Sequence, residues 1–215
     1  MKAVKEAREE QERLRKRVIL EDSFSAATKV GGCDVSCRRF SYTIHAGFVT
    51  LIDRKIVASS SATSTTTVPY IPGYLAFREV PALLEAYQCL SQKPDVLCVD
   101  GHGVCHPRGL GVASHLGVVL DIPTIGVGKS ILIGKPAREL GTIAGDQTDL
   151  VWEGKQVGIV LRTKNRCRPI IVSAGHKITL QTAVKLVLEL LAGYRLPEPT
   201  RLAHNIANQE RIAHG

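Results

Sequence analysis

The stretch DVLCVDGHGVCHPRGLGVASHLGVVLDIPTIGVGK, residues 95–129, alternates between two kinds of local pattern. Residues 95–101 and 123–129 are short apolar runs bounded by glycine and proline, which is typical of buried strands. Residues 111–120 between them are apolar and long enough for a short helix. A strand, a helix and a second strand in this order predict two parallel strands of one sheet.

The segments upstream indicate strands of a different kind. Residues 30–35, 42–52 and 55–68 have strand-like composition and are separated by short polar turns around Arg38 and Asp53. Connections this short favour an antiparallel meander. The Ser- and Thr-rich end of the third run is typical of an exposed strand that leads into a loop.

The remaining segments complete a mixed α/β pattern. A charged run rich in Ala and Leu predicts a peripheral helix over residues 2–19, with Val4, Ala7, Leu14 and Val18 facing inward. The other predicted elements are a helix over 77–90 with Pro81 in its first turn, a hairpin of 151–163 with 168–176, and helices over 179–194 and 200–212. No polar linker divides the chain, so we expect a single domain of residues 1–215.

Composition limits the class of partner. Lys and Arg number 28 against 20 Asp and Glu, a net charge of +8 that favours a polyanion such as nucleic acid. Only 5% of residues are aromatic, which argues against a binder built on rows of stacked rings. The cysteines lack the paired spacing of a zinc site or disulfide scaffold, and no run resembles a signal peptide or membrane helix. We therefore expect a soluble cytoplasmic protein with no membrane partner.

Two short motifs suggest ligands that their surroundings disfavour. GVGKS, residues 126–130, lacks the first glycine of a phosphate-binding loop at the required spacing. His102 and His106 are four residues apart, but glycines and a proline around them disfavour the helix that would place both imidazoles on one zinc ion. The same loop is better suited to face phosphate, with His106 and Arg108 as donors.

Three acids stand where a solvated charge is not expected. Asp34 lies in the first predicted strand, Glu79 near the start of a helix and Asp100 at the end of a buried strand. A buried carboxylate is costly unless it is paired or bound to metal, and three that converge would suit Mg²⁺ or Mn²⁺. Local alternatives remain: Asp34 pairing with Arg38, Glu79 stabilising a helix N-terminus, and Asp100 forming a turn.

These segments together resemble the endonuclease V family (deoxyinosine 3′ endonuclease, deoxyribonuclease V), enzymes that nick nucleic acid near deaminated adenine. The resemblance covers about residues 31–204. The matching blocks are GGCDVS, PYIPGYLAFREVPALL, KPDVLCVDGHGVCHPRGLGVASHLG, DIPTIGVGKS, RPIIVSAGHKITLQTAV and RLPEPTRLAH. Departures from the family pattern are Cys37 in place of an aromatic residue, Gly128 in place of alanine, and a short region over 38–58.

The resemblance implies an RNase H-like fold with an active site of carboxylates. It implies that Mg²⁺, or Mn²⁺ as a substitute, is held by Asp34 and Asp100, with Glu79 completing the acidic cluster. It further implies that His204 assists near the attacking water or metal, and that Lys129 and His106 contact or neutralise phosphate. From position alone, Lys129 and His204 are equally compatible with ordinary exposed residues.

The resemblance also implies how a lesion is recognised. The PYIP turn, here Tyr70, Ile71 and Pro72, would act as a wedge beside a base flipped out of the helix. The base pocket would be shaped by small groups and backbone at the following positions: Gly73, Leu75, Gly101 and Gly111. The rigid sequence PYIPG, residues 69–73, is by itself equally compatible with a stiff loop.

The function expected from the sequence is a monomeric, Mg²⁺-dependent DNA repair endonuclease specific for deoxyinosine. It would hydrolyse the second phosphodiester bond 3′ to the lesion and leave a 3′-hydroxyl and a 5′-phosphate. One alternative is a ribonuclease acting mainly on inosine in single-stranded RNA. Another is a binding module that uses the basic face without cleaving, although three carboxylates near phosphate would weaken binding unless a cation intervenes.

Overall fold

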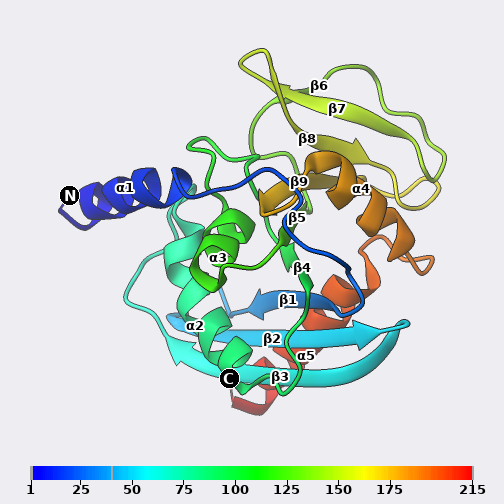
Figure 1. Cartoon of the computed structure of the whole chain (residues 1–215). Helices are drawn as coiled ribbons and strands as arrows, with labels where there is room; N and C mark the ends of the chain where they lie inside the picture. Colours follow the sequence, from blue (N-terminus) through cyan, green and yellow to red (C-terminus); the bar gives the residue numbers. More distant parts are fainter. Residues whose placement is uncertain (1, 40, 215) are drawn as a thin grey trace.

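Residues 2–39 and 41–214, which the computed structural model describes with side chains from Lys5 onward, form nine strands and five helices (Figure 1). The strands are β1 (Val30–Ser36), β2 (Thr43–Ile52), β3 (Lys55–Thr65), β4 (Val96–Asp100), β5 (Thr124–Gly128), β6 (Lys135–Pro136), β7 (Gln147–Trp152), β8 (Lys155–Leu161) and β9 (Ile170–His176). The helices are α1 (Lys2–Arg15), α2 (Leu75–Cys89), α3 (Val112–Leu120), α4 (Leu180–Glu189) and α5 (Glu198–His214). The side chain of Val4, predicted to face inward, lies outside the described residues.

The described strands form one mixed sheet in the order β3-β2-β1-β4-β5-β9-β8-β7-β6. β1, β2 and β3 pair antiparallel, which confirms the predicted meander, and β3 is the exposed edge strand. β4 and β5 pair parallel with α3 between them in sequence, which confirms the prediction for residues 95–129. β1 also pairs parallel with β4, so the carboxyl ends of β1, β4 and β5 lie at one edge of the sheet.

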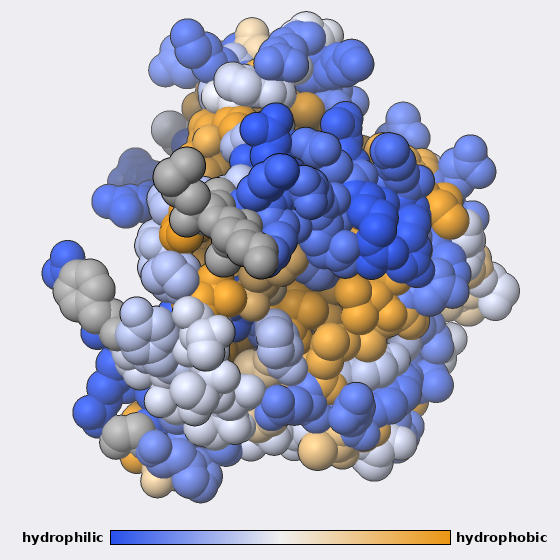
Figure 2. Space-filling model, turned by 90° about the vertical axis from the view of Figure 1, so that its left-hand side faces the viewer, coloured by the Kyte–Doolittle hydropathy of each residue, from blue (hydrophilic) through white to orange (hydrophobic). Residues whose placement is uncertain are grey.

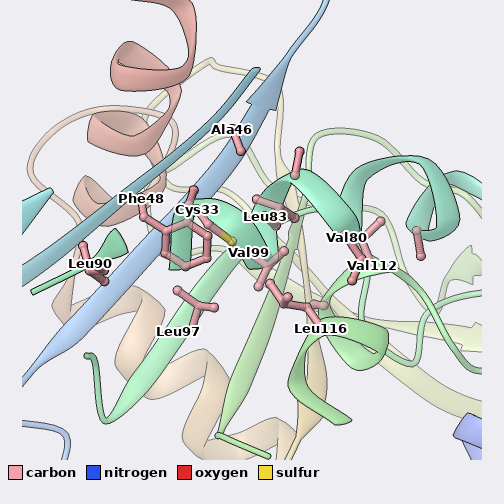
Figure 3. Close-up of a cluster of buried hydrophobic side chains, with 14 of the residues drawn as sticks. Cys33, Ala46, Phe48, Val80, Leu83, Leu90, Leu97, Val99, Val112 and Leu116 are labelled. Atoms are coloured by element: carbon pink, nitrogen blue, oxygen red, sulfur yellow. The ribbon is translucent and has the colours of Figure 1, made fainter. Parts of the chain in front are cut away.

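Alternating residues of the central strands send apolar side chains to both faces of the sheet. Leu97 and Val99 of β4 pack with α2 and α3, as the close-up in Figure 3 shows, whereas Val96 and Cys98 pack with α4. Phe48 of β2 lies in the first of these clusters, edge-on to the ring of Tyr87 with 5.7 Å between ring centroids. The sheet is therefore the middle layer of three, between helices on either side.

Helix α5 lies unusually close to the sheet. A Cβ atom added to Gly32 of β1 would stand 2.1 Å from the backbone oxygen of Pro199, and one added to Gly47 of β2 would stand 2.5 Å from the backbone nitrogen of Ala207. Ala203 and Ala207, the helix residues that face the sheet, are fully buried. Small side chains on both surfaces thus allow α5 to approach β1 and β2 closely.

Several predicted boundaries were wrong. Residues 151–163 are not one strand, because a turn at Glu153 and Gly154, both with positive φ, separates β7 from β8. α1 and α4 end at Arg15 and Glu189, before the predicted ends at residues 19 and 194, and α5 begins two residues earlier than predicted. Helix α2 begins at Leu75, so Pro81 lies in its second turn rather than its first.

Polar and apolar side chains are unevenly distributed over the surface. On the face shown in Figure 2, apolar side chains gather across the middle of the view, next to a strongly hydrophilic region. Among the described helices, none has the length and sustained hydropathy required to cross a membrane.

Candidate active site

Two of the predicted acids meet at the carboxyl edge of the parallel strands. Cys33 of β1 is in register with Val99 of β4, so the next residues, Asp34 and Asp100, lie side by side. The side chain of Asp34 is only 6% exposed and that of Asp100 13% exposed. One oxygen of Asp34, Oδ1, accepts a hydrogen bond from the backbone N–H of Val35 at 2.7 Å.

The charge of Asp100 opposes ionisation of both other acids, Asp34 and Glu79, which are poorly solvated. Burial, and then the charge of Asp100, raise the pKa of Asp34 to about 9. The same two causes raise the pKa of Glu79 on α2 to about 8. Opposite charge nearby would favour the ionised carboxylates, and clustered carboxylate oxygens suit a hard divalent cation.

The charge and the oxygen donors of the acids suit a metal ion, but the three side chains are not positioned to coordinate one together. Among residues 2–39 and 41–214, no group of three or more His, Cys, Asp or Glu side chains stands close enough to hold an ion as positioned. Asp34 and Asp100 are the pair that would hold Mg²⁺, with Glu79 as the third acid. The prediction that these carboxylates bind metal stays a prediction.

Lys129, which follows β5, lies against the acids. Its Nζ atom donates a hydrogen bond to Oδ2 of Asp100 and stands 3.8 Å from Oδ2 of Asp34. Although burial lowers it, the pKa of Lys129 is raised overall by the charges of these two carboxylates. In this arrangement the ammonium group neutralises carboxylates, whereas the resemblance assigned it to phosphate.

His204 of α5 contacts the same carboxylate, on the face of the sheet to which Asp34 points. Its Nδ1 atom lies 2.6 Å from Oδ2 of Asp34. Burial, together with the positive charge of Lys129, lowers the pKa of His204. The lowered pKa favours the neutral imidazole, and the structure brings His204 to the acids as the resemblance implied.

A cavity of about 230 Å³ adjoins the acids through Gly101, the residue after Asp100. Seven of the eight predicted substrate-binding residues line it: Tyr70, Pro72, Gly73, Leu75, Gly101, His106 and Gly111. Ile71 does not; its carbonyl oxygen accepts the N–H of Tyr74 in the turn that carries the wedge. Gly73 has a φ of +81°, a left-handed conformation that glycine adopts without strain.

Both ring nitrogens of His106 have partners within the protein. The backbone N–H of Arg108 donates to Nδ1 at 3.2 Å, so Nε2 carries the proton and donates to the carbonyl oxygen of Gly73 at 3.1 Å. Burial lowers the pKa of His106 to about 4. As positioned, His106 supports the pocket wall and has no free N–H for the predicted phosphate contact.

Gln11 of α1 is a site residue that the sequence did not reveal. It is fully buried, lines the cavity and donates from Nε2 to the carbonyl oxygen of Gly73 at 2.9 Å. Its Oε1 atom accepts a hydrogen bond from Nε of Arg108, whose guanidinium group also donates to Gly73 and stacks on Tyr74. One signal was available, because Gln11 and the buried Leu14 are three residues apart and share a face of α1.

We expect Gln11→Ala to lower the free energy of unfolding by about 1–3 kcal/mol, because it removes a buried hydrogen-bonding side chain and leaves a half-buried donor of Arg108 unpaired. It should also raise KM for substrate, because the Gly73 turn loses an anchor. Gln11→Glu retains the acceptor for Arg108 and loses the donor to Gly73, so it separates the two effects. Arg13→Ala, on the exposed side of α1, is the control, and chemical denaturation with steady-state kinetics is the measurement; equal effects of both alanine variants would contradict the assignment.

Comparison with known proteins agrees with this geometry. The family model of endonuclease V matches residues 12–205. An endonuclease V from Protochlamydia amoebophila is 48% identical over 206 residues, covering 94% of this chain and 87% of the relative. The crystal structure of the catalytic domain of human endonuclease V matches with a TM-score of 0.90 at 36% identity, covering 99% of this chain and 97% of that one.

A further solved structure contains nucleic acid. Ciona intestinalis endonuclease V, in complex with a 24mer DNA containing an inosine followed by a ribo-adenosine, matches with a TM-score of 0.87 at 30% identity over 100% of both chains. The likeness to these structures confirms the expected RNase H-like fold. Family model, sequence identity and structure thus agree over nearly the whole length, and the chain belongs to the endonuclease V family.

Proposed function

We propose that the chain nicks deoxyinosine-containing DNA at the second phosphodiester bond 3′ to the lesion, leaving a 3′-hydroxyl and a 5′-phosphate. Deoxyinosine-specific repair is the activity of its family. The observation that carries the proposal is that the cavity adjoins the pair of carboxylates, because Gly101, which lines the cavity, directly follows Asp100. A base held in that cavity would bring its own strand close to Asp34 and Asp100.

The residues divide the work between them. Asp34 and Asp100, with Glu79, would hold Mg²⁺ or Mn²⁺, which when bound supplies an activated water and stabilises charge on the phosphate and leaving oxygen. Lys129 is close enough to both aspartates to balance their charge in the absence of metal. With a cation bound by the aspartates, the ammonium group of Lys129 would be free to contact the substrate phosphate.

Recognition is assigned to the turn before α2. Tyr70 is 69% exposed at the rim of the cavity, and Pro69 and Pro72 stiffen the segment that carries it. A rigid aromatic side chain at this place would fill the gap left by a flipped base. The six free cysteines fit a reducing, cytoplasmic setting, and we take the monomer as the working unit.

We expect the protein to nick a duplex with one deoxyinosine when Mg²⁺ is present and to leave the matched adenine duplex intact. The measurement is a denaturing gel with end-labelled strands, which also locates the cut. Single-stranded RNA with one inosine, run at the same concentration, tests the ribonuclease alternative. Tight lesion binding in Ca²⁺ without turnover in Mg²⁺ or Mn²⁺ would instead support the binding module and contradict the proposal.

Tyr70→Ala is expected to lower kcat/KM on duplex substrate by about 10–100-fold, since stacking of one base on an aromatic ring is worth about 1–3 kcal/mol. The loss should be smaller on single-stranded substrate, where no base pair has to open. Tyr194→Ala, another exposed tyrosine, is the control. An equal loss on both substrates would count against a wedge.

A further inference from the structure

A line of four hydrogen bonds connects Asp34, at the carboxyl end of β1, with side chains of α5. Its first bond joins Asp34 Oδ2 to Nδ1 of His204 at 2.6 Å, and the second joins Nε2 of His204 to the amide nitrogen of Asn208 at 2.9 Å. The third joins Oδ1 of Asn208 to the hydroxyl of Ser36 at 2.7 Å. The fourth joins that hydroxyl oxygen to Nε of Arg211 at 2.9 Å.

The donors and acceptors along this line are complementary when Asp34 is ionised and His204 is neutral. A carboxylate can only accept, so Nδ1 of His204 carries the proton. Its Nε2 atom is then an acceptor, which the amide N–H of Asn208 satisfies. Arg211 can only donate, so the oxygen of Ser36 accepts that bond, and the Ser36 hydroxyl donates in turn to Oδ1 of Asn208, which leaves the amide N–H of Asn208 facing His204.

The spacing of these residues along β1 and α5 places their side chains opposite one another. Asp34 and Ser36 are two residues apart on β1 and so point to the same face of the sheet. His204, Asn208 and Arg211 are spaced by four and three residues on α5 and so share one side of that helix. The close approach of α5 at Gly32 and Gly47 brings the two rows within hydrogen-bond distance.

We propose that Asn208 is a positioning residue, supported by Ser36 and Arg211, which holds His204 in the Nδ1–H tautomer and thereby orients the Asp34 carboxylate. Both ring nitrogens of His204 are then occupied, so the histidine acts by orienting Asp34 rather than by taking a proton from water. The kinetic consequence rests on the proposed function. The tautomer itself does not.

The first test reads the tautomer directly. Nitrogen-15 NMR of the Mg²⁺-bound, substrate-free protein is expected to show His204 protonated at Nδ1 and unprotonated at Nε2. Asn208→Asp has nearly the same shape, but its carboxylate can only accept, so a proton on Nε2 is expected in that variant. An unprotonated Nε2 in Asn208→Asp, or a protonated Nε2 in the wild type, would overturn the proposal.

The second test separates positioning from packing. Loss of an outer hydrogen-bond partner at a metal site typically costs about 10–100-fold in metal affinity or activity, and we expect kcat to fall within that range for both Asn208→Asp and Asn208→Ala. Ser36→Ala should have a smaller effect, because it acts one bond further away. Ser61→Ala is the matched control, since it removes a 2.6 Å hydrogen bond to Glu210 of the same helix without touching the line.

The outcomes are distinct. Near-normal kcat for Asn208→Asp with a large loss for Asn208→Ala would mean that Asn208 only fills space, and the proposal would be wrong. Equal losses for Ser61→Ala and Asn208→Ala would point to general loosening of α5, with the same conclusion. If the wild-type protein does not nick inosine substrates at all, the proposed function fails, while the NMR result still decides the tautomer.

Discussion

Asp100→Asn is expected to reduce nicking of a deoxyinosine duplex by about 10³-fold, because a bound metal contributes several kcal/mol of charge stabilisation and about 1.4 kcal/mol corresponds to tenfold in rate. Asparagine retains the shape of the side chain and removes its charge. The protein should still fold, since Asp100 opposes the ionisation of Asp34 and Glu79 in the wild type.

Single-turnover nicking at saturating Mg²⁺ measures the loss, and circular dichroism checks the fold. Asp95→Asn is the matched control, because Asp95 lies just before the opposite end of β4 and accepts a hydrogen bond from the backbone of Lys29 at 2.8 Å. The pKa of Asp34 should fall in the Asp100→Asn variant, which NMR titration of its carboxyl group can follow. Undiminished nicking by a folded Asp100→Asn protein would remove Asp100 from the site.

Raising the pH from about 7 to about 9 is expected to destabilise the metal-free protein. Asp34 and Glu79 have folded-state pKa values raised to about 9 and about 8, above those of the unfolded chain. The folded state therefore binds more protons than the unfolded state, and the stability that is present below about pH 4 decreases as the pH rises through the folded-state values. Each group contributes a slope of up to about 1.4 kcal/mol per pH unit.

Urea denaturation at a series of pH values measures this slope. The interval lies above the titration of the buried His106 and His115, whose pKa values are lowered to about 4. Asp34→Asn and Glu79→Gln should each flatten the curve, and Mg²⁺ should restore stability at pH 9 because it binds the ionised, folded form. A curve that is flat, or that rises, between pH 7 and 9 in the wild type would show that these acids are not strained in the fold.

Much of the fold followed from local patterns. The parallel unit of residues 95–129 and the meander before it can be recognised from short segments of sequence, because their apolar runs and turn residues are local. The turn at Glu153 and Gly154 was missed because the apolar residues on either side of the polar segment 153–156 were assigned to one strand. The ends of α1 and α4 were missed for a related reason, since favourable composition continues beyond the last helical residue.

The contacts between the site residues were harder to predict from the sequence. Asp34, Glu79 and Asp100 could be singled out as acids in apolar surroundings, but the contact of Lys129 with two of them depends on the pairing of three strands. Gln11 lies in a charged helix that the sequence assigned to the periphery. The spacing from Leu14 could place Gln11 on the inner face of that helix, but its role depends on where α1 packs against the rest of the protein.

The close packing of α5 has a consequence for the protein while it is being made. Asp34 and His204 are 170 residues apart, and α5 covers β1 and β2 only where glycine and alanine permit contact. At about 5–20 residues per second, a ribosome spends roughly ten to thirty seconds on the intervening chain. Throughout that time a nascent chain can possess its meander and its parallel strands and still lack His204 and Asn208. We expect the nuclease to remain immature until α5 has emerged, so that a nascent chain without α5 should cut nucleic acid poorly.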